Sequence, residues 1–131
     1  MNVRPCSALV LIIDHDLGFM MWLGEIFAEL GCQAMPALNC RQALALTKRL
    51  ELPVAIIVVN PEMRGAERMV KALVAANPDV RLVLIRDLAT DCLEVQPNPS
   101  GLRARFILAR PSPGDPISRP DWVARIRKVV Q

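Results

Sequence analysis

The chain has 131 residues, of which 53% are hydrophobic, so it can form one packed core but has no room for a second. Its longest apolar runs, Ala8 to Ile13 and Val54 to Val59, are far shorter than the roughly 20 residues that a membrane-spanning helix needs. We therefore predict a single domain over residues 1–131 that is located in the cytoplasm, without a signal peptide or membrane contact.

The net charge of +3 is unevenly distributed along the chain. Residues 1–60 hold four basic and five acidic side chains, whereas residues 61–131 hold twelve basic and eight acidic ones. A basic C-terminal half could attract nucleic acid or an acidic protein. Because no aromatic side chains alternate with these basic residues to stack on bases, a solvated helix face is the simpler interpretation. We expect no nucleic acid among the partners.

Four cysteines are scattered along the chain, at Cys6, Cys32, Cys40 and Cys92. They form no Cys-x-x-Cys motif, and the single histidine, His15, does not complete a metal-ligand spacing with them. A zinc site is therefore not indicated. In a cytoplasmic chain of this size, buried free thiols are expected rather than disulfide bonds.

The first predicted elements are a strand and a helix. Residues Ala8 to Ile13 are continuously apolar, which is typical of a strand covered on both faces. After residues 14–16, apolar side chains recur with the spacing of one helix face, and Gly31 is a suitable residue to end that helix. The helical core positions are Phe19, Leu23, Ile26, Phe27 and Leu30. The neighbouring Met-Met-Trp segment, residues 20–22, either packs against the last helix or the rim of the sheet, or forms a partner-binding patch.

Two strands and a helix follow. Gln33 to Ala37 is a short strand that Pro36 limits to a sheet edge, because proline cannot donate a hydrogen bond to a neighbouring strand. Asn39 is a suitable N-cap for a helix over Arg41 to Leu50. Val54 to Val59 is again continuously apolar and predicts a third strand.

The second half of the chain continues the alternation. Ala66 to Ala76 predicts a helix that ends at residues 77–78, an Asn-Pro pair, and Val80 to Ile85 predicts a fourth strand. The core positions expected in this helix are Val70, Leu73 and Val74.

The last third is less regular. Leu88 to Val95 could form a short fourth helix before a proline-rich segment that no helix can include. Arg105 to Ala109 predicts a fifth strand, and Pro120 to Val130 predicts a final helix. The core positions of the final helix are Trp122, Val123, Ile126, Val129 and Val130.

Alternating strands and helices predict an α/β fold with an open parallel sheet and helices on both faces. In such sheets, ligands bind at the carboxyl ends of the strands. Six polar residues follow the predicted strands there: Asp14, His15, Asp16, Asn60, Arg86 and Arg110. A glycine-rich phosphate loop or a Ser–His–Asp arrangement is not indicated, so the sequence supports neither a nucleotide-binding enzyme nor a serine hydrolase.

Four segments at these strand ends resemble the motifs of one protein family, the receiver domain of two-component response regulators. In chain order they are IIDHDLGF, IIVVNPEMRG, LVLIRD and FILARP. The resemblance covers residues 8–130 and implies a flavodoxin-like fold, a three-layer sandwich around a five-stranded parallel sheet, with a fourth helix that is short or irregular in this chain. It also implies bacterial signal transduction, with a histidine kinase or an output protein as partner.

The resemblance assigns the site of phosphoryl transfer residue by residue. Asn60 falls where the family has its phospho-accepting aspartate. The family's pair of acidic magnesium ligands falls on Asp14 and His15, and Asp16 follows one position later. Imidazole is a poor magnesium ligand, although Asp14 and Asp16 could together hold a weakly bound ion. We therefore predict no dedicated metal site and no cofactor.

Three further positions complete the resemblance. Arg86 stands where the family has a switch threonine or serine, and Arg110 stands where it has a lysine. Pro111 matches a proline whose peptide bond is typically cis in the family. The turn after Asn60 is also shorter than the family's, with Arg64 in place of a proline. These departures argue against a coordinated two-state switch.

The two arginines leave alternatives open. Arg110 could form a bidentate pair with Asp14 or Asp16 as an internal counter-ion, or it could point to solvent. Arg86 could form a salt bridge with Asp87, with Asp91 or with the same carboxylates, or it could lie exposed.

An amide at position 60 removes the family's chemistry. Its oxygen carries no full negative charge and its nitrogen lone pair is delocalised, so Asn60 cannot attack a phosphoryl donor. Nor can Asn60 readily deamidate to aspartate, because that route needs the backbone N–H of the next residue and Pro61 has none. We predict that the chain has no catalytic residue and is not an enzyme.

The sequence therefore predicts a degenerate receiver domain that is not phosphorylated and acts through protein–protein interaction. The expected partner surface is the face made by the fourth helix, the fifth strand and the last helix, through which a homodimer could also form. Two alternatives remain. One is a small-anion sensor that uses Arg86 and Arg110, and the other is residual phosphoryl transfer through Asp16.

Overall fold

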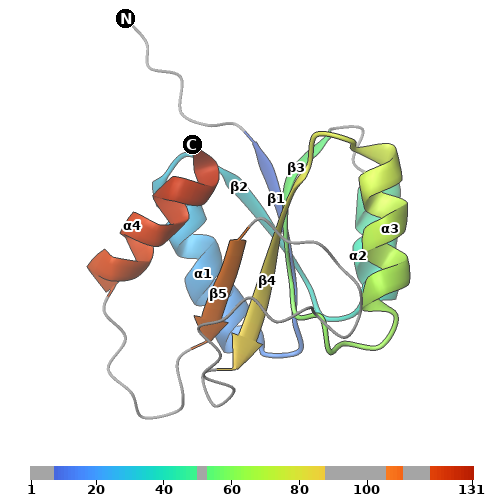
Figure 1. The fold of residues 1–131 in the computed structure, drawn as a ribbon, viewed down its shortest axis with the longest axis horizontal. Coiled ribbons are helices and arrows are strands. Elements are labelled where there is room, and N and C mark those ends of the chain that lie inside the picture. The colour runs from blue at the N-terminus through green and yellow to red at the C-terminus, as the bar shows by residue number, and fades with distance from the viewer. Residues whose placement is uncertain (1–7, 50–52, 88–105, 111–118) are drawn as a thin grey trace, which may run out of the picture.

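The computed structural model describes residues 8–49, 53–87, 106–110 and 119–131, and for residues 87, 106 and 110 it describes the backbone (Figure 1). The elements are β1 Leu9–Ile13, α1 Leu17–Glu29, β2 Gln33–Ala37, α2 Cys40–Arg49, β3 Val54–Val59, α3 Ala66–Ala76, β4 Arg81–Asp87, β5 Phe106–Arg110 and α4 Arg119–Val130. The predicted helix over Leu88 to Val95 lies outside the described residues. None of the described helices is long and apolar enough to cross a membrane.

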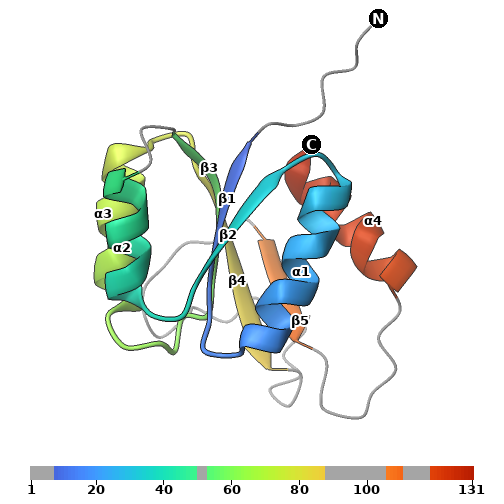
Figure 2. The same cartoon turned by 180° about the vertical axis from the view of Figure 1, so that it is seen from behind.

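The five strands form one parallel sheet in the order β2-β1-β3-β4-β5. Helices α2 and α3 cover one face of this sheet, and α1 and α4 cover the other (Figures 1 and 2). The predicted α/β three-layer sandwich is therefore confirmed. Strand β2 lies at an edge of the sheet, as its proline predicted.

The central strands β1 and β3 divide their side chains between two cores. Leu11 and Ile57 lie in the core beneath α2 and α3, whereas Ile12 and Val58 lie in the core beneath α1 and α4. Successive side chains point to opposite faces of the sheet, and both faces are covered, so every position along these strands must be apolar. This is why the two strands appear in the sequence as continuous apolar runs.

The predicted helix ends are confirmed at three places. Gly31 follows α1 with a positive φ of 85°, a conformation that glycine adopts without steric cost. The Asn39 side chain accepts a hydrogen bond from the Gln42 backbone N–H at 2.7 Å and so caps α2. Asn77 ends α3, where its amide donates to the Leu73 carbonyl and its side-chain oxygen accepts from the Val54 N–H.

Two boundary and burial predictions were wrong. Strand β4 continues to Asp87 instead of ending at Ile85, and Arg86 pairs in register with Ala109 of β5. A parallel ladder is made by backbone groups, so a charged side chain does not end it. In α3, Val74 is 37% exposed. The buried stripe of this helix consists of Ala66, Met69, Val70 and Leu73, and the next position, Val74, lies beside the stripe and faces away from the core.

Helices α1 and α4 meet in an aromatic seam, which we define as Phe19, Trp22 and Trp122. The Trp122 ring packs edge-on against both others, with centroid separations of 5.9 Å to Phe19 and 5.3 Å to Trp22. Met20 is buried beside the seam. Packing against the last helix is therefore the role of Trp22, and Met20 belongs to the same core, whereas Met21 is 55% exposed.

Arginine side chains hold both ends of α4. At its first residue, the Arg119 guanidinium lies 3.1 Å from the Glu29 carboxylate and 3.9 Å from that of Glu25, both on α1. At its last turn, Arg81 of β4 donates to the backbone carbonyls of Val129 and Gln131. Basic side chains are favourable at a helix C-terminus because the last carbonyls have no partner within the helix.

The prediction of thiols rather than disulfide bonds is confirmed for the two cysteines in the described ranges. Cys32 and Cys40 are both buried, and neither belongs to a disulfide bond. Burial raises the pKa of the Cys40 thiol above its ordinary value, because the thiolate would lose its hydration. Cys6 and Cys92 lie outside the described residues.

Candidate functional site

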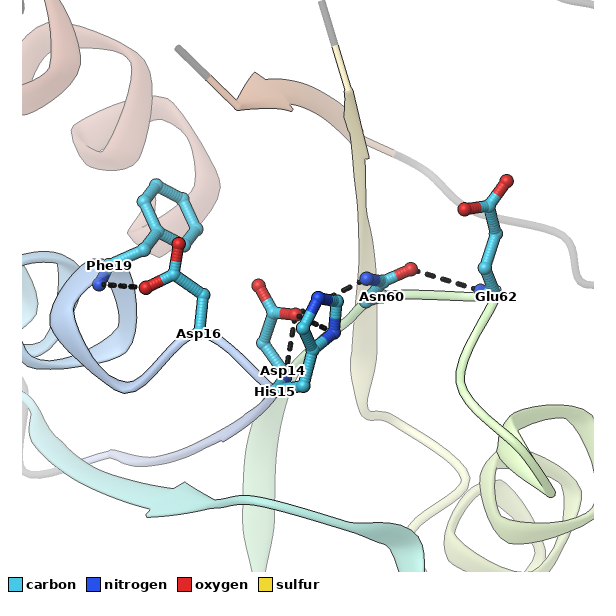
Figure 3. A network of polar contacts seen from close by, with 6 residues as sticks. All are labelled: Asp14, His15, Asp16, Phe19, Asn60 and Glu62. Atoms are coloured by element: carbon cyan, nitrogen blue, oxygen red, sulfur yellow. Dashed lines mark hydrogen bonds and ion pairs between the residues drawn. The ribbon is translucent and has the colours of Figure 1, made fainter. Parts of the chain in front are cut away.

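The carboxyl ends of β1 and β3 place Asp14 and Asn60 side by side (Figure 3). The strands pair Ile13 with Val59, and the Asn60 N–H extends this pairing by donating to the Ile13 carbonyl at 3.0 Å. On the other side of β1, the Asp14 N–H donates to the Ala37 carbonyl at 3.3 Å. Sheet register, rather than proximity in sequence, therefore brings these two polar side chains together.

A hydrogen bond joins the two side chains. The Asn60 Nδ2 donates to Asp14 Oδ1 at 3.2 Å, and both groups are buried, with exposed fractions of 7% and 0%. The same Oδ1 accepts from the His15 backbone N–H at 2.7 Å. The His15 side chain is 71% exposed and has its Nδ1 3.2 Å from that oxygen. A buried carboxylate is costly unless donors surround it, and the Asn60 amide is one of these donors.

The orientation of the Asn60 amide follows from its second hydrogen bond. Asn60 Oδ1 accepts from the Glu62 backbone N–H at 3.0 Å. A backbone N–H can only donate, so the amide oxygen must face Glu62 and the NH₂ group must face Asp14. The Met63 N–H also donates to the Asn60 carbonyl at 3.2 Å, which closes the turn after β3.

Asp16 does not join Asp14 and Asn60. It is the N-cap of α1, and its Oδ1 accepts from the Phe19 backbone N–H at 3.0 Å. Figure 3 places its carboxylate on the α1 side of the turn, away from Asn60. A signal for this role is present in the sequence, because an aspartate directly before a helical apolar repeat is a preferred N-cap, whereas the prediction placed Asp16 with Asp14 at a weak ion site.

The described residues do not fit the magnesium site that the resemblance implies. No three His, Cys, Asp or Glu side chains within the described ranges are arranged to hold a metal ion. One carboxylate oxygen of Asp14 already accepts from two N–H donors, and a carboxylate oxygen of Asp16 is engaged in capping α1. The intervening His15 offers imidazole, whereas magnesium prefers oxygen ligands in octahedral geometry.

The basic residues of the predicted site are placed in part. Arg86 lies within β4 rather than after it, and its side chain is partly buried. The backbone of Arg110 ends β5 and pairs in register with Asp87. The Arg110 side chain and the whole of Pro111 lie outside the described residues, so the counter-ion hypothesis and the cis-proline hypothesis stay predictions.

Comparison with known proteins identifies the fold. No family model and no curated protein matches the sequence. A response regulator from Thermotoga maritima superposes with a TM-score of 0.71 at 11% identity, over 95% of this chain and 98% of the other. The chemotaxis response regulator CheY4 of Vibrio cholerae superposes with a TM-score of 0.69 at 17% identity, over 95% of this chain and 99% of the other.

A third similar structure contains a signalling partner. It is the complex of the histidine kinase ThkA with the response regulator protein TrrA, matched with a TM-score of 0.64 at 16% identity, over 95% of this chain and 99% of the other. At these identities the similarity concerns the fold. Together with the strand order and the helices on both faces of the sheet, it leads to one conclusion. The chain has the flavodoxin-like fold of response regulator receiver domains.

Proposed function

We propose that this chain is a degenerate receiver domain of bacterial signalling that accepts no phosphoryl group and acts in the cytoplasm through protein–protein interaction. The observation that supports this most directly is the hydrogen bond from Asn60 Nδ2 to Asp14 Oδ1. The side chain at the acceptor position presents N–H donors to the neighbouring carboxylate and its neutral oxygen to Glu62. Neither end is a nucleophile for a phosphoryl donor, and the proposal accordingly includes no enzymatic activity.

The two alternatives receive less support. Phosphoryl transfer through Asp16 would need a carboxylate aimed into the site, but this carboxylate caps α1. Uncapping the helix would cost about 1 kcal/mol before any chemistry began. Anion sensing requires the convergence of Arg86 and Arg110, and no contact within the described ranges favours it. It remains a prediction.

A phosphodonor experiment tests the first half of the proposal. The protein is incubated with acetyl phosphate and magnesium and its intact mass is measured. A receiver domain that carries the aspartate serves as the positive control. The mass of this chain should stay unchanged while that of the control rises. An added phosphoryl group that peptide mapping places on Asp14 or Asp16 would contradict the proposal.

The second half of the proposal concerns the partner. In the family the expected surface includes the last strand and the last helix. Here α4 exposes Arg125, Arg127 and Lys128, and β5 exposes Ile107. Among its described residues this surface is mainly basic and includes the apolar Ile107, which suits an acidic surface of a histidine kinase, of an output protein or of a second copy of the chain.

Capture from the source cell tests this surface. The parent protein and an Arg125→Glu, Lys128→Glu double variant are used as baits. We expect the parent to retain a partner that the double variant loses, and sedimentation of both baits reports whether that partner is a second copy. Equal capture by both baits would place the contact on another face.

A further inference from the structure

The turns that follow β1 and β3 are connected through side chains rather than through the backbone alone. The first turn is residues 14–16, and the second runs from residue 60 to Gly65, the residue directly before α3. Asn60 bonds to both: its Nδ2 donates to Asp14 in the first turn, and its Oδ1 accepts from Glu62 in its own turn. One buried amide thus contacts two segments that lie 46 residues apart in the sequence.

We propose that Asn60 is a brace that holds these two turns in one fixed arrangement without a phosphoryl group or a metal ion. This inference rests on the proposed function and adds a positive role for the amide. The residue at position 60 would then be a positioning residue for the two turns, not a vestige of lost chemistry.

The hydrogen-bond requirements at this position are selective. A donor must face Asp14 and an acceptor must face Glu62, within one short buried side chain. Aspartate supplies the acceptor but would place a second carboxylate against Asp14 at about the present 3.2 Å. Alanine supplies neither, and it would leave the Glu62 N–H without its acceptor. Asparagine satisfies both requirements at no cost in charge.

The His15 N–H is the sensitive reporter of the brace. It donates to Asp14 Oδ1, the oxygen that also accepts from Asn60 Nδ2, so it responds to position 60 through this shared carboxylate. The Phe19 N–H donates to Asp16 in the same turn and serves as an internal reference, because the α1 cap does not involve Asn60. Hydrogen exchange measured by NMR follows both amides in the folded protein.

The experiment compares the parent with Asn60→Ala, Asn60→Asp and a matched control, Asn39→Asp. Asn39 uses its side chain only as an acceptor in the described contacts, so aspartate should serve there equally well. In Asn60→Ala the His15 and Glu62 amides should exchange about three- to tenfold faster, the effect of losing one hydrogen bond. The Phe19 amide, and all three amides in Asn39→Asp, should keep their parent rates.

Addition of magnesium to the Asn60→Asp variant tests whether the donor of Asn60 matters or only its lack of charge. Asn60→Asp should also show faster exchange at His15, and added magnesium should slow it again, because a cation can bridge two facing carboxylates. The parent should not respond to magnesium. If Asn60→Asp does not fold, Asn60→Ala alone decides the outcome.

An unchanged His15 exchange rate in Asn60→Ala would overturn the brace, even if only the Glu62 amide became faster. A magnesium response of the parent would also overturn it, since the turns would then need the ion. Neither result depends on the phosphodonor experiment. The exchange rates could contradict the brace while the parent protein still accepts no phosphoryl group. Conversely, phosphorylation of the parent would contradict the proposed function, and the exchange rates would still test the brace separately.

Discussion

The polar pair at the strand ends and the aromatic seam between α1 and α4 both join distant parts of the chain, by opposite physical means. Asp14 and Asn60 meet through one directional hydrogen bond in a buried site. In the seam, Trp122 meets Phe19 and Trp22 through large apolar surfaces at ring separations of 5.3 to 5.9 Å. The pair depends on the identity of a few atoms, whereas the seam depends on contact area.

This contrast indicates a division of labour. The seam should contribute most of the stability that attaches α4 to α1, and the pair should determine the local arrangement of two turns at a small gain in stability. Substitutions in the pair and in the seam should therefore differ in how much they lower the free energy of unfolding and in how strongly this loss depends on the chemistry of the new side chain. Substitutions at four positions test the contrast.

The largest effect is expected for Trp122→Ala. Removal of this buried ring leaves a cavity against both other aromatic side chains and should destabilise the fold by about 3–5 kcal/mol. Denaturant unfolding measures the change. Trp122→Phe, which keeps much of the apolar area, should recover more than half of the loss. If alanine and phenylalanine cost equally little, the seam is not the main attachment of α4.

Asn60→Asp should have the next largest effect, about 1–3 kcal/mol, because it replaces a buried donor by a second carboxylate. The cost should decrease in acid, where the two carboxyl groups can share a proton. It should also nearly vanish in an Asp14→Asn background, which removes one of the two charges. Unfolding of the four proteins of this cycle measures the coupling. Equal costs in both backgrounds would show that the repulsion is not the cause.

Asp16→Ala should cost about 1 kcal/mol through loss of the α1 N-cap. Asp16→Asn should cost much less, because an amide oxygen can accept from the Phe19 N–H as well. Thermal or denaturant unfolding of both variants provides the comparison. If asparagine were as damaging as alanine, the charge of Asp16 would matter more than its capping. Asp16 would then be a candidate for an acidic site together with Asp14.

The smallest effect is expected for Arg119→Ala, about 0.2–1 kcal/mol, since its pairs with Glu25 and Glu29 lie at the surface. The loss should decline further at high salt, where such pairs are screened. Unfolding at low and high ionic strength measures it. A loss that rivals that of Trp122→Ala would mean that ion pairs, not the aromatic rings, attach α4 to α1.

Much of the fold was predictable because it depends on local patterns. The bounds of β3 and α3 follow from a six-residue apolar run and from a helical repeat ended by Asn77. The edge position of β2 follows from Pro36, which lacks an N–H whatever surrounds it. The extension of β4 to Asp87 was not predictable, because the ladder continues through backbone pairing with β5, which local charge does not reveal.

The sequence predicted which residues lie at the candidate site better than it predicted what each of them does there. Sequence placed Asp14, Asp16 and Asn60 at strand ends on one edge of the sheet, because parallel strands end together. The N-cap preference before the apolar repeat of α1 pointed to the role of Asp16, but the sequence could not show the direction in which each aspartate side chain leaves the turn. Asp14 lies within hydrogen-bond reach of β3, and Asp16 lies at the first turn of α1.

By itself, then, the sequence determined the order of the described elements, the two-sided core and the absence of a nucleophilic carboxylate at position 60, since these follow from residue type and periodicity. The tertiary structure decided what the asparagine does instead. The register of β1 against β3 puts its NH₂ group on the Asp14 carboxylate, and the turn after β3 puts the Glu62 N–H on its oxygen. Hydrogen bonds between residues 46 positions apart depend on atomic positions that only the packed sheet fixes.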